Sequence, residues 1–166
     1  MRSLIIGLIL GASSAQADIE LRFIEGAPKD RFDLIATGPA CNDAPLEVTI
    51  DLSGAQGGLI FDVTAAGQGV EVYQPFELVA GADLLQSATS LRDGDQVLTL
   101  SLRALPAGQV LSFTTDLDDT GGGREITVDG AEIAGASVIV TNGAATQTAE
   151  FGPDARAIID QSDCLS

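Results

Sequence analysis

The stretch LEVTIDL, residues 46–52, alternates apolar and polar side chains at every position. A period of two places one set of side chains on each face of an extended chain, which is typical of a strand with one buried and one solvated face. The same alternation recurs in IELRFI (19–24), VLTLSL (97–102) and REITV (124–128). These patterns predict half-buried β-strands from the beginning of the chain to near its end.

Five further runs rich in apolar and β-branched residues have the length of a strand and are separated by turn residues. They span residues 59–63, 70–79, 109–115, 136–141 and 146–151. Asn142-Gly143 stands between the last two runs and predicts a tight hairpin. Pro75 interrupts the run 70–79, and because proline has no N–H to donate, it predicts an edge strand or a break there.

Helical signals are scarce. Residues 83–86 fit a single turn and residues 153–160 a short C-terminal turn, but no window keeps an apolar stripe of 3.6-residue period for three turns. About ten short strands without intervening helices are typical of two antiparallel sheets packed face to face. We therefore expect an all-β, antiparallel, jelly-roll-like β-sandwich.

The first 17 residues, MRSLIIGLILGASSAQA, have the layout of a secretory signal peptide. Arg2 precedes a short apolar stretch, and Ala15-Gln16-Ala17 supplies the small residues of a cleavage site. The apolar stretch is too short to cross a membrane. Cleavage would leave residues 18–166 as a single domain that is secreted or periplasmic. A retained N-terminal helix, acting as an anchor or core element, is the alternative.

Two cysteines remain after cleavage, Cys41 and Cys164. An even number of cysteines in an exported protein favours a disulfide. The alternative of a catalytic or zinc-bound thiol lacks support, because the chain has no C-x-x-C motif and no histidine. We expect a Cys41–Cys164 disulfide that closes almost the whole mature chain.

The chain carries a formal net charge of −16. Negative charge repels nucleic-acid phosphates and anionic lipids and attracts cations. Since the chain contains no histidine, the Ser-His-Asp mechanism cannot operate. We expect a binding protein rather than an enzyme, with no nucleic-acid partner and no membrane span after cleavage.

The stretch LSFTTDLDDTGGGREITVDG, residues 111–130, contains D-x-D-x-T, the nucleophile motif of haloacid-dehalogenase-type phosphatases. That chemistry requires an α/β fold with the motif at the tip of a parallel strand, followed by helices and a cation for the phosphate. The residues after Thr120 have strand patterns instead, and the sole lysine, Lys29, lies far upstream. A metal-dependent phosphatase is therefore the weakest hypothesis.

The same motif also resembles the opening of a calcium loop. Asp116 and Asp118 project from one face of the preceding strand, and Asp119 lies at the turn that follows. Calcium binds six to eight hard oxygens, which clustered carboxylates and loop carbonyls supply. The site is not an EF-hand, because Thr127 replaces the bidentate glutamate. We predict metal ligation by Asp116, Asp118 and Asp119, with an ion-free acidic turn as the open alternative. Candidates for the remaining ligands are Glu125, Asp129 and Asp30.

Three segments resemble small secreted proteins of marine proteobacteria that are labelled aggregation-factor-core proteins, after a sponge proteoglycan of calcium-dependent cell adhesion. They are FIEGAPKDRFDL (23–34), GGLIFDVTAAGQGVEVYQPFEL (57–78) and LSFTTDLDDTGGGREITVDGAEIAGA (111–136). The resemblance implies calcium-dependent adhesion or aggregation with a cell-surface or matrix protein or glycan as partner. It brings no catalytic residue and no ligand residue with it.

Two functions from different classes follow. The first is a secreted, non-enzymatic, calcium-stabilised protein of cell-surface or matrix adhesion. The second is a carbohydrate-binding module, for which Tyr73 and Phe76 are the candidate sugar-stacking platform. Because aromatic residues make up only 4% of the chain and tryptophan is absent, core or edge packing is the simpler role for both side chains.

Overall fold

The computed structural model describes residues 18–161, apart from 28, 39–42, 68, 70–71 and 122–126. The predicted signal peptide and both cysteines of the predicted disulfide lie outside the described residues. No helix in the described part of the chain is long and apolar enough to cross a membrane.

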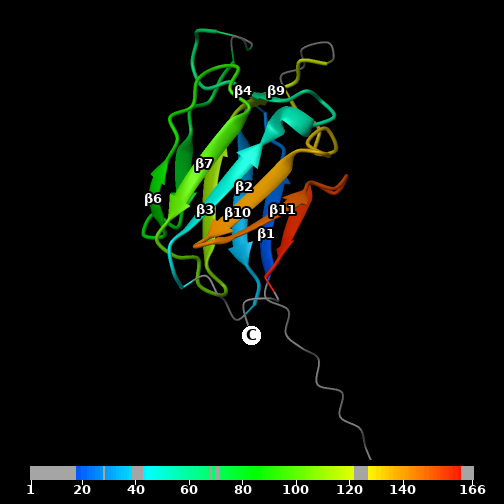
Figure 1. The fold of residues 1–166 in the computed structure, drawn as a ribbon. Helices are drawn as coiled ribbons and strands as arrows, with labels where there is room; N and C mark the ends of the chain where they lie inside the picture. Colours follow the sequence, from blue (N-terminus) through cyan, green and yellow to red (C-terminus); the bar gives the residue numbers. More distant parts are fainter. Residues whose placement is uncertain are drawn as a thin grey trace, which may run out of the picture.

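Two five-stranded antiparallel sheets pack face to face (Figure 1). The first sheet has the order β12 (Arg156–Asp160), β1 (Asp18–Ile24), β2 (Asp30–Ala36), β8 (Val110–Thr115) and β5 (Glu77–Ala80). The second has the order β11 (Ala145–Glu150), β10 (Ser137–Asn142), β3 (Leu46–Asp51), β7 (Val97–Leu102) and β6 (Leu85–Ala88). The predicted antiparallel β-sandwich of about ten strands is confirmed.

Two further short strands, β4 (Ile60–Phe61) and β9 (Leu117–Asp118), pair with each other at one end of the sandwich, at the top of Figure 1. A 3-10 turn, η1 (Leu52–Gly54), follows β3 at the same end. Thr120 Oγ1 closes this end by donating a 2.7 Å hydrogen bond to the carbonyl of Gly58, which has a left-handed φ of 64°.

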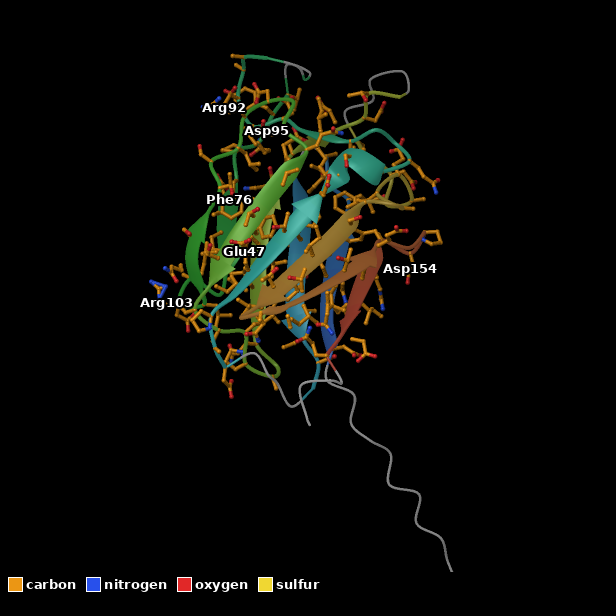
Figure 2. The ribbon with its side chains drawn as sticks, in the orientation of Figure 1. Glu47, Phe76, Arg92, Asp95, Arg103 and Asp154 are labelled. Atoms are coloured by element: carbon orange, nitrogen blue, oxygen red, sulfur yellow. The ribbon has the colours of Figure 1, made fainter. Side chains whose placement is uncertain are left out.

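Along the strands, every second side chain points into the core between the two sheets. In β3, Val48 and Ile50 are fully buried, whereas Glu47 is exposed on the outer face of its sheet (Figure 2). On the inner face of the first sheet, Phe32 and Phe113 stack with ring centroids 5.2 Å apart. Each fully buried Leu, Ile or Phe side chain contributes about 1.5–3 kcal/mol relative to an exposed one. The alternate positions that are apolar in the sequence are therefore the positions on the buried face of each strand.

Several elements differ from the sequence-based expectation. The predicted turn over 153–160 is wrong, because β12 begins at Arg156 and buries Ala157 and Ile159. Strand β2 has no counterpart among the predicted strands, although its Phe32 and Leu34 are fully buried. The expected single turn at 83–86 is a turn over 82–84 that leads into β6.

Residues 70–71 of the expected strand 70–79 lie outside the described residues, and of the described ones only those from Glu77 onward form a strand. This strand is β5, which lies at the edge of its sheet, as Pro75 indicates. Of the expected strand 124–128, residues 124–126 lie outside the described residues, and 127–128 are not in a strand. The Asn142-Gly143 hairpin is confirmed, since β10 and β11 pair up to Asn142 and Ala145, and Gly143 has a φ of 59°.

Candidate metal centre

The pairing of β4 with β9 brings together acidic residues that are far apart in the sequence. Ile60 lies opposite Asp118 and Phe61 opposite Leu117. Directly after β4, the N–H of Asp62 donates a hydrogen bond of 3.1 Å to the carbonyl of Asp116. Asp62 is thereby placed beside the strand end that carries Asp116 and Asp118.

One carboxylate oxygen from each of Asp62, Asp116 and Asp118 lies within 4.8 Å of the other two. All three residues are buried, with exposed fractions of 1%, 1% and 3%. Two of the three predicted ligands are thus brought together. The third member of the group is Asp62, whereas Asp119 is buried next to Asp118 in the chain but lies outside the group.

The carboxyl group of Asp116 is in an environment that opposes its charge. Burial, followed by the charges of Asp30, Asp118 and Asp62, raises its pKa to about 8 from an ordinary 3.8. Its Oδ2 atom is buried and has no hydrogen-bond partner among the described residues. A buried, unsatisfied carboxylate is costly unless a proton or a cation compensates it. The group therefore has the electrostatic character of a cation site.

A fourth carboxyl group lies behind this site. Asp30, at the start of β2, is 1% exposed, and burial raises its pKa to about 7. The backbone N–H groups of Gly26 and Leu117 partly oppose this shift, whereas the charges of Glu25 and Asp118 add to it.

On its other side, the carboxylate of Asp62 abuts the backbone of Gly69. A Cβ atom at residue 69 would lie 2.3–2.4 Å from Cγ, Oδ1 and Oδ2 of Asp62. The carbonyl of Asp62 also accepts a 3.3 Å hydrogen bond from the N–H of Gln74. The absence of a side chain at Gly69 is therefore what leaves room for the carboxylate of Asp62.

A cavity of about 130 Å³ opens beside the Asp62 carboxylate. It is lined by Asp62, Thr64, Ala65, Ala66, Gly67, Gly69 and Asp93. A water molecule takes about 30 Å³ in the liquid, so several waters fit there. Of the three grouped aspartates only Asp62 lines this cavity, so water there would reach the group from the side of Asp62.

Asp93 belongs to the wall of this cavity and not to the group of three. Its Oδ1 accepts hydrogen bonds of 2.8 Å from the N–H groups of both Val63 and Thr64. Burial favours the neutral form, but the bonds from the Thr64 side chain and these two N–H groups outweigh it and hold the pKa of Asp93 below its ordinary value. Asp95 is similarly engaged with the N–H of Arg92 at 2.8 Å, in a loop at the same end of the sandwich (Figure 2).

The other candidate ligands are not in the group. Asp129 closes its own turn by accepting a 2.8 Å hydrogen bond from the N–H of Ala131. Glu125 lies outside the described residues. The sequence predicts residues 59–63 only as a strand, and this prediction does not single out Asp62 as a ligand. The available signal was an aspartate in the middle of the apolar run LIFDV.

The D-x-D-x-T motif lies in an antiparallel setting, since β8 pairs antiparallel with both β2 and β5.

The two residues of the candidate aromatic platform differ in how far they are exposed. Phe76 is half-buried and packs on Phe113 with ring centroids 5.0 Å apart, whereas Tyr73 is 36% exposed. The face that Phe76 presents to Phe113 is thus part of the core.

No family model matches the chain, and no curated protein and no solved structure is significantly similar to it. The function must be inferred from the site itself.

Proposed function

We propose that this protein is a secreted, non-enzymatic binding protein in which calcium holds together the loops at one end of a β-sandwich. We further propose that it acts in cell-surface or matrix adhesion. The observation that supports this proposal most directly is the group of three buried carboxylates, in which Oδ2 of Asp116 has no hydrogen-bond partner among the described residues.

Calcium fits this donor set best on chemical grounds. Three carboxylates offer up to six hard oxygens, and calcium takes six to eight at flexible geometry. Magnesium demands an octahedral shell and gives up its waters reluctantly. Zinc prefers histidine and cysteine, and the chain has no histidine. Extracellular calcium sites typically bind with a Kd on the order of 10⁻⁴–10⁻³ M, which suits an exported protein.

The role in adhesion rests on the position of the site and on the resemblance to aggregation-factor-core proteins. A cation held by the carboxylates beside the β4–β9 pair would fix the chain segments at one end of the sandwich, where a partner could approach them. Surface loops that a rigid scaffold holds in place often carry the residues that bind a partner. The partner class is a cell-surface or matrix protein or glycan.

A groove favours the carbohydrate-binding module as a second candidate. The groove has a volume of about 290 Å³ and begins at Val63 and Thr64, directly after Asp62. It is lined by Val63, Thr64, Pro75, Phe76, Ala88, Thr89, Ser90 and Leu91. Hydroxyl groups, one aromatic ring and the absence of charged residues in this lining suit a neutral sugar.

The two functions are separated by a pair of measurements on the purified protein. Calcium-dependent clustering of protein-coated beads, reversed by chelator, supports adhesion. Binding to a neutral glycan array that is the same in calcium and in chelator, without bead clustering, supports the carbohydrate-binding module and contradicts the adhesion proposal. The variant Asp116→Asn/Asp118→Asn should lose clustering, whereas Asp95→Asn, in a nearby loop, serves as the matched control.

A further inference from the structure

Asp30 reaches the cation site from a different strand. It pairs with Thr115 in the register between β2 and β8, and its side chain is almost completely buried. It does not belong to the group whose oxygens lie within 4.8 Å of one another. A direct metal bond is therefore not its role in this arrangement.

Both carboxylate oxygens of Asp30 accept hydrogen bonds from the backbone. Oδ2 accepts from the N–H of Leu117 at 3.0 Å, and Oδ1 accepts from the N–H of Gly26 at 2.9 Å. Leu117 is the residue between Asp116 and Asp118. The bond to its N–H fixes the peptide between Asp116 and Leu117, and so helps to set the directions in which the two side chains leave the chain.

The position of Asp30 also has an electrostatic consequence. Its Oδ2 lies 3.0 Å from the N–H of Leu117, the residue between the two ligands, so its charge lies close to both of them. Charges that repel one another in a buried site all attract a cation placed among them, and buried pairs are weakly screened.

We propose that Asp30 is a positioning residue of the cation site, which holds the Leu117 amide so that Asp116 and Asp118 face the ion together and which adds a fourth negative charge behind them. This inference rests on the proposed function, because it assigns a role toward the cation of that same site. Outer carboxylates that orient metal ligands typically strengthen binding by 10–100-fold.

The alternative is a purely structural role, in which Asp30 only closes the turn before β2. That turn is tight, since a Cβ atom on Gly26 would lie 2.0 Å from the carbonyl oxygen of Lys29. A structural role predicts loss of stability in chelator with an unchanged affinity for calcium in the folded protein. The two roles are therefore distinguished by affinity and not by stability alone.

The test is calorimetric titration of calcium into chelator-treated protein, for the wild type, Asp30→Asn and Asp33→Asn. Asp33 is the matched control, because it lies on the same strand and carries the same charge but bonds Ser112 Oγ at 2.6 Å, away from the site. We expect Asp30→Asn to raise the Kd for calcium about tenfold with unchanged stoichiometry. We expect Asp33→Asn to stay within about twofold, because the charge of Asp33 is already paired with Arg31 at 3.2 Å.

A second readout separates charge from general loosening of the fold. Terbium is trivalent, so the loss of the fourth charge should weaken terbium binding more than calcium binding. Tyr73 is the only tyrosine and tryptophan is absent, and its neighbour Gln74 bonds the carbonyl of Asp62, so excitation of Tyr73 should sensitise a bound terbium ion.

If Asp30→Asn does not fold in chelator, the calcium affinity of Asp30→Glu tests the proposal instead. This variant keeps the negative charge, but its longer side chain moves the carboxylate away from the N–H of Leu117. Weakened calcium binding by the folded variant supports the proposal. A wild-type Kd for calcium in the folded variant would overturn it. Failure of the wild-type protein to bind calcium would instead overturn the proposed function.

Discussion

The backbone N–H of Asp62 is hydrogen-bonded to the carbonyl of Asp116 at 3.1 Å, which joins two segments that the sequence keeps far apart. This bond continues the β4–β9 pairing and aligns the two carboxylates of a buried acidic group. The pairing of two very short strands is therefore what creates the site.

Replacing Asp62 by Asn should weaken calcium binding more than replacing Asp119 by Asn. Asp62 supplies one of the three grouped oxygens, whereas Asp119 lies outside the group. We expect at least a tenfold increase in Kd for Asp62→Asn in a calcium titration, as for the loss of a charged ligand. A larger effect of Asp119→Asn than of Asp62→Asn would favour the ligand set predicted from the sequence, with Asp119 as the third ligand.

Gly69→Ala should impair the site through sterics alone. The added Cβ would lie 2.3–2.4 Å from three atoms of the Asp62 side chain, so the carboxylate must move away. The expected result is a large loss of calcium affinity with little change in the melting temperature in chelator, because a side-chain end shifts at low cost. Gly130→Ala is the control, since its Cβ would have only ordinary contacts, at 3.5 and 3.6 Å. Normal calcium binding by Gly69→Ala would contradict this geometry.

The metal-free protein should lose stability as the pH rises from about 5 to 8.5. The folded-state pKa values of Asp30 and Asp116 are raised to about 7 and about 8 from an ordinary 3.8. Protonation therefore favours the folded state, and this contribution is fully present below pH 4 and is lost as the pH passes through 7 and 8. Melting temperatures in chelator should decline across this window, and less steeply in Asp116→Asn. A flat profile for the wild type would show that these two groups do not titrate as described.

Ala155→Gly should stabilise the protein. Ala155 has a φ of 58°, in the left-handed region where residues with a Cβ atom are strained by about 1–2 kcal/mol. Its carbonyl accepts a 2.9 Å bond from Phe23 N–H, which the substitution retains. We expect a gain of up to about 1 kcal/mol, or a few degrees in melting temperature. Ala157→Gly, in β12, should have the opposite sign, and a loss of stability in both variants would contradict the strain argument.

The fold could largely be predicted from the sequence, because a strand with one buried face has to alternate apolar and polar side chains. The alternation in 46–52 and 97–102 corresponds to β3 and β7, which are paired at the centre of the second sheet. The sequence predicts a short turn over residues 153–160, whereas β12 occupies the last five of them. Only the pairing with β1 identifies it as a strand.

The site could be predicted only in part. Asp116 and Asp118 are two residues apart, so strand parity places them on one side. The position of Asp62 in the group depends on the pairing of β4 with β9, which are far apart in the sequence, and no local pattern encodes this pairing. Asp119 was expected to fold over the same point, but the chain continues from β9 toward Thr120, which is held by Gly58 instead.

Thermal unfolding in calcium and in chelator, at constant ionic strength, tests the central claim most directly. An ion that binds only the folded state at tenfold excess over its Kd stabilises it by about 1.4 kcal/mol. For a domain of this size the account predicts a rise in melting temperature of about 3–5 °C, smaller with magnesium and absent in Asp116→Asn/Asp118→Asn. Superimposable melting curves in calcium and in chelator would contradict the account, because Asp62, Asp116 and Asp118 would then form a buried acidic group without an ion.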